Sequence, residues 1–129
     1  MIVRNLQKVR EENREVPSEG WISRRYLLKK DGMGFSFHET IIEKGAVLEM
    51  EYKNHYEAVF CVKGRGTLYD YENDTTYLIE PGTMYALNCH DKHRLTGIEE
   101  MTMMCVFNPP VTGDEVHDKS GAYPLVEEE

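Results

Sequence analysis

Residues 45–64 read GAVLEMEYKNHYEAVFCVKG, and this stretch decides the fold of the chain. A glycine stands at each end, and Glu57 directly precedes the apolar run AVFCV. Glycine adopts the backbone conformations that tight turns need, so Gly45 and Gly64 predict turns on either side of short strands. A carboxylate beside so apolar a run must be paired, protonated or coordinated, which makes Glu57 a candidate ligand.

The spacing resembles the first motif of the cupin superfamily, which reads G, five residues, H-x-H, three or four residues, E, six residues, G. Gly45, Glu57 and Gly64 occupy the expected positions. Glu51 and Lys53 stand where the two histidines would be. The resemblance therefore implies either a cupin without metal or one whose metal ligands come from other residues.

The rest of the chain supports an all-β fold. Between Trp21 and Phe107, short runs rich in β-branched and aromatic residues alternate with turn signals such as Asp31-Gly32 and Pro81-Gly82. This pattern predicts a single cupin (jelly-roll) barrel of about nine to eleven short strands with one or two short helices. We expect a short strand at Ile2-Val3, followed by a brief helix capped by Asn5.

With 129 residues the chain forms one domain. We divide it into an N-terminal extension (1–20), the barrel (21–108) and a C-terminal lid or tail (109–129). The rigid turn Asn108-Pro109-Pro110 is expected to aim the last segment back at the barrel mouth as a lid. A disordered terminus is the ordinary alternative.

Composition excludes several classes of partner. With 15 basic and 23 acidic side chains the net charge is −8, which disfavours binding to nucleic acid or anionic lipid. No apolar run approaches the roughly 18 residues of a membrane span, and the N-terminus lacks the features of a secretory signal. The three cysteines form no CxxC pair, which suits a reducing compartment. We expect a soluble, cytoplasmic protein.

Two further metal ligands are candidates in the region of the second cupin motif. Tyr85 follows Pro81-Gly82 where a histidine is usual, and His93 comes eight residues later, across the turn at 88–92. A hairpin closing there would point both side chains inward. With Glu57 they would supply two oxygens and one nitrogen, a set that suits a divalent first-row metal such as iron. A core tyrosine and a surface histidine are the ordinary alternatives, and spacing alone leaves both open.

Four longer stretches are similar to the ectoine synthase family of small cupins: DGMGFSFHETII, YKNHYEAVFCVKGRG, PGTMYALNCHDKHRL and CVFNPPVTGDEVHDKSGAYPL. The similarity covers nearly the whole chain. It implies a lyase of compatible-solute biosynthesis, acting under osmotic stress, that cyclises N-γ-acetyl-L-2,4-diaminobutyrate to L-ectoine with loss of water. It also implies Fe(II), or another divalent metal, at Glu57, Tyr85 and His93, and a homodimer.

The resemblance further associates eight positions with substrate handling: Trp21, Arg25, Thr40, Tyr52, His55, Phe107, Glu115 and His117. Among these, Glu115 and His117 are candidate proton acceptors in catalysis, and Tyr52 is a candidate proton donor. Tyr52 would face away from Glu57 in an uninterrupted strand, so a break near Asn54 is required. His38 is a weaker candidate because the family varies at its position.

The remaining candidates would bind the substrate. Arg25 suits its carboxylate because a guanidinium pairs with carboxylates through two hydrogen bonds, whereas Arg24 would alternate to the opposite face. Trp21 and Phe107 would wall the pocket, and Thr40 and His55 would form hydrogen bonds. Two other functions remain as alternatives, a small-molecule-binding cupin without catalysis and an iron-dependent cupin oxygenase.

Overall fold

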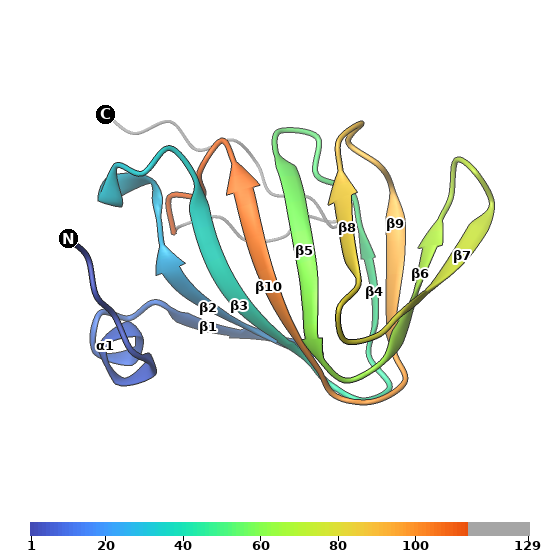
Figure 1. Cartoon of the computed structure of the whole chain (residues 1–129), viewed down its shortest axis with the longest axis horizontal. Coiled ribbons are helices and arrows are strands. Elements are labelled where there is room, and N and C mark those ends of the chain that lie inside the picture. The colour runs from blue at the N-terminus through green and yellow to red at the C-terminus, as the bar shows by residue number, and fades with distance from the viewer. Residues whose placement is uncertain (114–129) are drawn as a thin grey trace.

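Ten strands form two antiparallel sheets in residues 1–113, the part of the chain that this computed structural model describes (Figure 1). The larger sheet has the order β1-β2-β3-β10-β5-β8 and the smaller one β4-β9-β6-β7. The strands are β1 (Glu15–Ser18), β2 (Trp21–Leu27), β3 (Ser36–Ile42), β4 (Val47–Met50), β5 (Tyr56–Lys63), β6 (Gly66–Asp70), β7 (Thr75–Ile79), β8 (Met84–Leu87), β9 (His93–Gly97) and β10 (Met101–Asn108). The all-β barrel predicted from the sequence is confirmed.

The alternation of side chains along the strands separates the core from the surface. On β5, Glu57, Val59 and Cys61 are buried, whereas Tyr56 and Phe60 are exposed. Successive side chains of a strand point to opposite faces of the sheet, so each strand contributes alternate residues to the barrel interior. The inner face of β5 therefore carries a carboxyl group into the barrel interior, next to the apolar side chain of Val59.

The N-terminal residues pack against the larger sheet. Helix α1 (Leu6–Glu11) is capped by Asn5, whose side chain accepts a hydrogen bond from the Lys8 amide at 2.9 Å, as expected. The expected strand at Ile2-Val3 is wrong, because these residues are exposed and pair with no strand. The end of the predicted extension instead forms β1, which pairs with β2.

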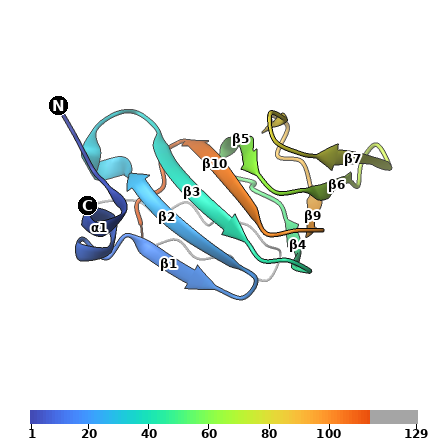
Figure 2. The same cartoon turned by 60° about the horizontal axis from the view of Figure 1, so that its bottom comes forward.

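One end of the barrel gathers the features that matter for function. Strands β4, β8 and β10 end there and β5 and β9 begin there, so the loops 51–55 and 88–92 lie at the same rim (Figures 1 and 2). At the opposite end, Gly64 has a φ of +85°, and a Cβ there would lie 2.0 Å from the Glu100 carbonyl oxygen. Only glycine fits so close an approach.

The chain after β10 turns toward the connection between β2 and β3. The Val111 amide donates to the Ser36 hydroxyl at 3.0 Å, and the Val111 carbonyl accepts from the Lys29 amide at 2.9 Å. Residues 114–129 of the predicted lid lie outside the described ones, so the lid stays a prediction from the sequence. No helix in residues 1–113 is long and apolar enough to cross a membrane.

Candidate functional site

Glu57 and Tyr85 lie on the same inner surface of neighbouring strands. In the β5–β8 ladder, Glu57 pairs with Leu87 and Val59 pairs with Tyr85, so Glu57 and Tyr85 are diagonal neighbours. Burial raises the pKa of Glu57 to about 8, and a hydrogen bond with the Cys105 thiol offsets only part of this rise. Burial, followed by the charge of Glu57, raises the pKa of Tyr85 well above its ordinary value.

His93 approaches the same space from the smaller sheet. It begins β9, is 2% exposed, and its ring centroid lies 6.4 Å from that of Tyr85. Its Nδ1 lies 2.9 Å from the Asp91 carbonyl oxygen, which can only accept a hydrogen bond. Nδ1 therefore carries the proton, and Nε2 keeps a free lone pair, as in the histidine ligands of metals. Burial lowers the pKa of His93, which favours this neutral form.

The donor chemistry of these three side chains fits a divalent cation. The Nε2 atom of His93 is buried and has no hydrogen-bond partner within residues 1–113. The Glu57 carboxyl is 8% exposed, and burial disfavours its charged form unless a cation lies beside it. No three His, Cys, Asp or Glu side chains of the described chain gather into a group that could hold a metal. Beside Glu57 and His93, the phenol of Tyr85 is the further donor that the neighbouring strand brings to this place.

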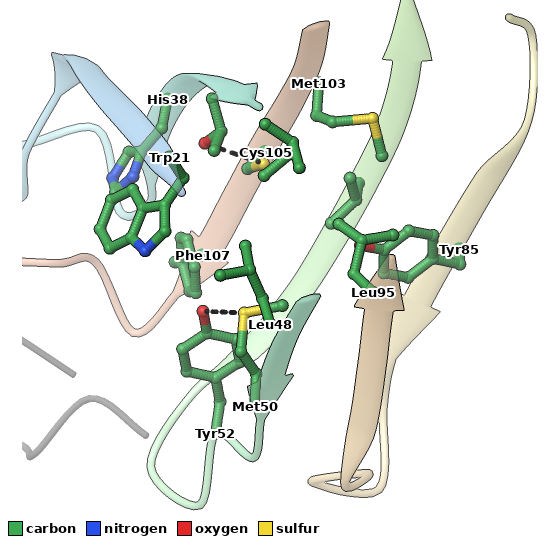
Figure 3. Close-up of a pocket in the computed structure, with 13 residues that line it drawn as sticks. Trp21, His38, Leu48, Met50, Tyr52, Tyr85, Leu95, Met103, Cys105 and Phe107 are labelled. Atoms are coloured by element: carbon green, nitrogen blue, oxygen red, sulfur yellow. Dashed lines mark hydrogen bonds between the residues drawn. The ribbon is translucent and has the colours of Figure 1, made fainter. Parts of the chain in front are cut away.

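A cavity adjoins this group inside the barrel (Figure 3). Its walls come from both sheets and are mostly apolar. Tyr85 lines it on one side, and three of the residues expected to bind substrate, Trp21, Thr40 and Phe107, line it on the other. The structure therefore places the candidate metal ligands next to the candidate substrate pocket.

Phe107 is the ring around which the other aromatic candidates pack. Its centroid lies 5.1 Å from that of His38, 5.3 Å from Tyr52 and 5.9 Å from His55. His55 is 1% exposed, and its Nδ1 donates to the Pro109 carbonyl at 3.0 Å. His55 thus holds the start of the segment 109–113. His55 is not among the described residues that line the cavity.

Tyr52 faces inward because the strand is broken where the sequence required a break. Strand β4 ends at Met50 and β5 begins at Tyr56, so residues 51–55 belong to no strand. The Tyr52 hydroxyl donates to Met50 Sδ at 3.3 Å, and its ring lies 6.1 Å from that of His93. Glu51 and Lys53 occupy the positions of the two missing cupin histidines. Their side chains form an ion pair at 3.3 Å, and Lys53 lies at the surface.

Arg25 and His38 face each other across the β2–β3 ladder beside the cavity. Arg25 is 1% exposed; its Nε donates to the Ser23 hydroxyl at 3.5 Å and its Nη1 to the Gly113 carbonyl at 3.0 Å. His38 lines the cavity, and burial, together with the charge of Arg25, lowers its pKa to about 3. His38 is therefore a neutral hydrogen-bonding group at neutral pH.

Arg24 lies on the opposite face of β2, as expected. It donates to Glu15 and Glu39, each at 2.8 Å, on the outer surface of the sheet. Glu115 and His117, the two candidate proton acceptors, lie outside the described residues. Their positions relative to the cavity therefore stay a prediction from the sequence.

Two residues that the sequence did not single out belong to the site. Cys105 lines the cavity, contacts the Thr40 hydroxyl at 3.6 Å and hydrogen-bonds the Glu57 carboxyl. Ser23 lies between Arg25 and His38, 3.4 Å from the Nδ1 of His38. A buried cysteine and a strand serine are ordinary core residues, so only the strand pairing reveals their neighbours.

Comparison with known proteins gives one consistent result. A family model described as ectoine synthase matches residues 1–127. The L-ectoine synthase of Desulfosudis oleivorans is 58% identical and covers 99% of this chain and 100% of its own length. The L-ectoine synthase of Nocardia farcinica is 55% identical and covers 98% of this chain and 96% of its own length.

Solved structures agree with the sequence comparison. The ectoine synthase from P. lautus superposes with a TM-score of 0.87 at 47% identity, covering 100% of this chain and 93% of that one. A cupin domain of a transcriptional regulator from Enterobacter cloacae aligns with a TM-score of 0.59 at 12% identity, over 70% of this chain and 98% of that one. At this low identity the second match shows a shared cupin fold alone.

The pKa of Glu57 predicts how stability depends on pH in metal-free protein. A carboxyl whose pKa is raised to about 8 on folding stabilises the fold below its unfolded value of 4.5, and this stability is lost as the pH rises through 8. Glu57→Gln removes the titrating group. Between pH 5 and 8 we expect the stability of the variant to rise relative to that of the unchanged protein, by up to about 1.4 kcal/mol per pH unit.

Urea unfolding in the presence of a chelator at pH 5, 6.5 and 8 measures this difference. Glu51→Gln makes the same chemical change at a partly exposed position and is the matched control. A stability difference between Glu57→Gln and the unchanged protein that stays constant across the three pH values would refute this account of Glu57.

Proposed function

The chain belongs to the ectoine synthase family and is a lyase, and on this premise we propose that it cyclises N-γ-acetyl-L-2,4-diaminobutyrate to L-ectoine with loss of water, using a divalent metal ion. The observation that carries the proposal is the grouping of buried Glu57 and His93 with partly buried Tyr85 beside a largely apolar cavity. The cavity is the proposed place of the substrate, and the group of three side chains is the proposed place of the metal.

In this proposal Glu57, Tyr85 and His93 hold the metal ion. Two oxygen donors and one imidazole nitrogen suit Fe(II), and other divalent first-row metals fit the same set. When bound, the ion supplies Lewis acidity, which activates the poorly electrophilic acetamide carbonyl of the substrate. The hydrogen bond from His93 Nδ1 to the Asp91 carbonyl keeps Nε2 available as a ligand.

The walls of the cavity would fold the substrate for an intramolecular reaction. The α-amine of the substrate must reach its own acetamide carbon, closing a six-membered ring as the C–N bond forms and the C–O bond breaks. Trp21 and Phe107, which line the cavity, would hold this folded conformation and so supply the orientation that the step requires. Thr40, on the same wall, would hydrogen-bond the substrate.

Protons must leave the substrate ammonium and reach the departing oxygen. Glu115 and His117 are the proposed acceptors of the ammonium proton, and Tyr52 is the proposed donor. The Tyr52 hydroxyl is buried and donates to a thioether, Met50 Sδ. The Tyr52 ring also lines the cavity, which places the proposed donor beside the substrate.

The dehydration also needs a site from which water is excluded. His55 and Arg25 both hydrogen-bond the backbone of the segment 109–113, which we propose as the start of a lid. Covering the cavity in this way would protect the cyclic amidine from hydrolysis. We propose that His55 holds this segment in place and also hydrogen-bonds the substrate.

We further propose a homodimer in the cytoplasm. The outer face of β5 and β8 exposes Tyr56, Phe60, Val62 and Met84, each by 45% or more. Phe60 and Met84 are paired in the ladder, so these side chains adjoin, and an apolar patch of this kind is typical of a protein interface. The three cysteines are free, which suits a reducing compartment.

Direct assay tests the reaction. Purified protein is incubated with N-γ-acetyl-L-2,4-diaminobutyrate, with added Fe(II) or after removal of metal by a chelator, and the cyclic product is followed by NMR. We expect ectoine with Fe(II) and little or none without metal. Equal turnover in metal-free protein would overturn the metal dependence, and no ectoine under any metal condition would overturn the reaction.

The two adjacent arginines of β2, Arg24 and Arg25, offer a matched test of whether Arg25 binds the carboxylate of the substrate. Arg25→Ala is expected to raise KM about tenfold or more with a smaller effect on kcat, because a charged hydrogen-bonded pair contributes roughly 1.5–3 kcal/mol. Arg24→Ala, on the opposite face, should leave KM unchanged. Circular dichroism of both variants checks the fold. An unchanged KM with normal turnover in Arg25→Ala would refute the assignment.

A further inference from the structure

A groove distinct from the substrate cavity opens between β8 and the β6–β7 hairpin. Strands β8 and β7 are each the last strand of their sheet, so the barrel wall is not closed by hydrogen bonds at this place. The groove has a volume of about 640 Å³. It is wide enough for a cation that keeps its water shell.

The groove and the substrate cavity meet at Tyr85, one of the three candidate metal ligands. Tyr85 lines both of them, so its ring forms part of the wall between the two spaces. His93 lines the groove, is 2% exposed, and its Nε2 has no hydrogen-bond partner among the described residues. A buried nitrogen lone pair at the base of an open groove is a site that a metal ion can satisfy.

The charged side chains known to line the groove are acidic. Three carboxylates line it, those of Asp70, Glu72 and Asp91, and no lysine or arginine is among the described residues that do so. The nearest basic side chains in sequence are turned elsewhere: Lys92 lies 4.9 Å from the ring centroid of Tyr71 and Arg94 lies 5.0 Å from that of Tyr69. The groove therefore attracts cations.

The substrate cavity has the opposite character. Its described lining contains no carboxylate and is dominated by apolar side chains such as Leu48, Met50 and Phe107. A hydrated divalent cation would lose its water there without gaining carboxylate ligands, which is costly. Hard cations instead exchange their water ligands for carboxylate oxygens.

We propose that this groove is the entry route of the divalent metal ion. Asp70, Glu72 and Asp91 collect the hydrated cation, and His93 and Tyr85 receive it at the base of the groove. The metal then reaches its site without crossing the substrate cavity. This inference rests on the proposed metal ligands and adds to them a loading path and the residues that form it.

The rate of metal uptake tests the route. In the variant Asp70→Asn/Glu72→Gln/Asp91→Asn, each carboxylate becomes an amide of nearly the same shape. Metal-free protein is mixed anaerobically with Fe(II), and unbound Fe(II) is followed with a chromophoric chelator. We expect uptake about fivefold to tenfold slower at low ionic strength, with unchanged final occupancy and a difference that shrinks at high salt.

A matched control removes the same charge elsewhere. Glu19→Gln/Glu43→Gln/Glu99→Gln neutralises three exposed carboxylates at the opposite end of the barrel and should load at the rate of the unchanged protein. Because Asp70 also accepts hydrogen bonds within its turn, the double variant Glu72→Gln/Asp91→Asn repeats the test with that turn intact. It should show a smaller slowing of the same kind.

The outcomes separate the route from the metal site. Normal loading of the groove variants, or equal slowing in the control, overturns the entry route while the proposed ligands stand. If the unchanged protein takes up no Fe(II), the metal site itself fails and the route fails with it. Slowing confined to the groove variants and abolished by salt is the result that the route predicts.

Discussion

The burial of one carboxyl group, that of Glu57, is the constraint on which the rest of the site depends. Its place on the inner face of β5 follows from the alternation of the strand, and the described chain supplies only a thiol hydrogen bond to it. A buried carboxylate without a cation is unfavourable, so this end of the barrel is stable either with a proton or with a metal on Glu57. In the proposed metal-bound state, Tyr85 and His93 are the other two ligands.

Much of this arrangement could be predicted from residues that are neighbours in the sequence. The period-two pattern placed Glu57 inside β5, and it placed Arg25 and Arg24 on opposite faces of β2. The same rule required a break between Tyr52 and Glu57, which is present at residues 51–55. These features depend on neighbours in sequence, which is why a single chain reveals them.

Features that depend on long-range pairing could not be predicted. Cys105 reaches Glu57 only because β10 pairs with β5, and Ser23 adjoins His38 only because β2 pairs with β3. The groove beside β8 arises from the order of the strands, which leaves β7 and β8 at sheet edges. The expected strand at Ile2-Val3 was wrong because two apolar residues without a pairing partner gain no ladder hydrogen bonds.

We propose that a single metal ion, bound by Glu57, Tyr85 and His93, lies between a substrate cavity and a solvent groove. Crystals of the iron-loaded protein, with anomalous diffraction recorded on both sides of the iron absorption edge, test this most directly. The account predicts one strong anomalous peak within coordination distance of all three side chains. A peak at other ligands, with Tyr85 or His93 uncoordinated, would contradict it.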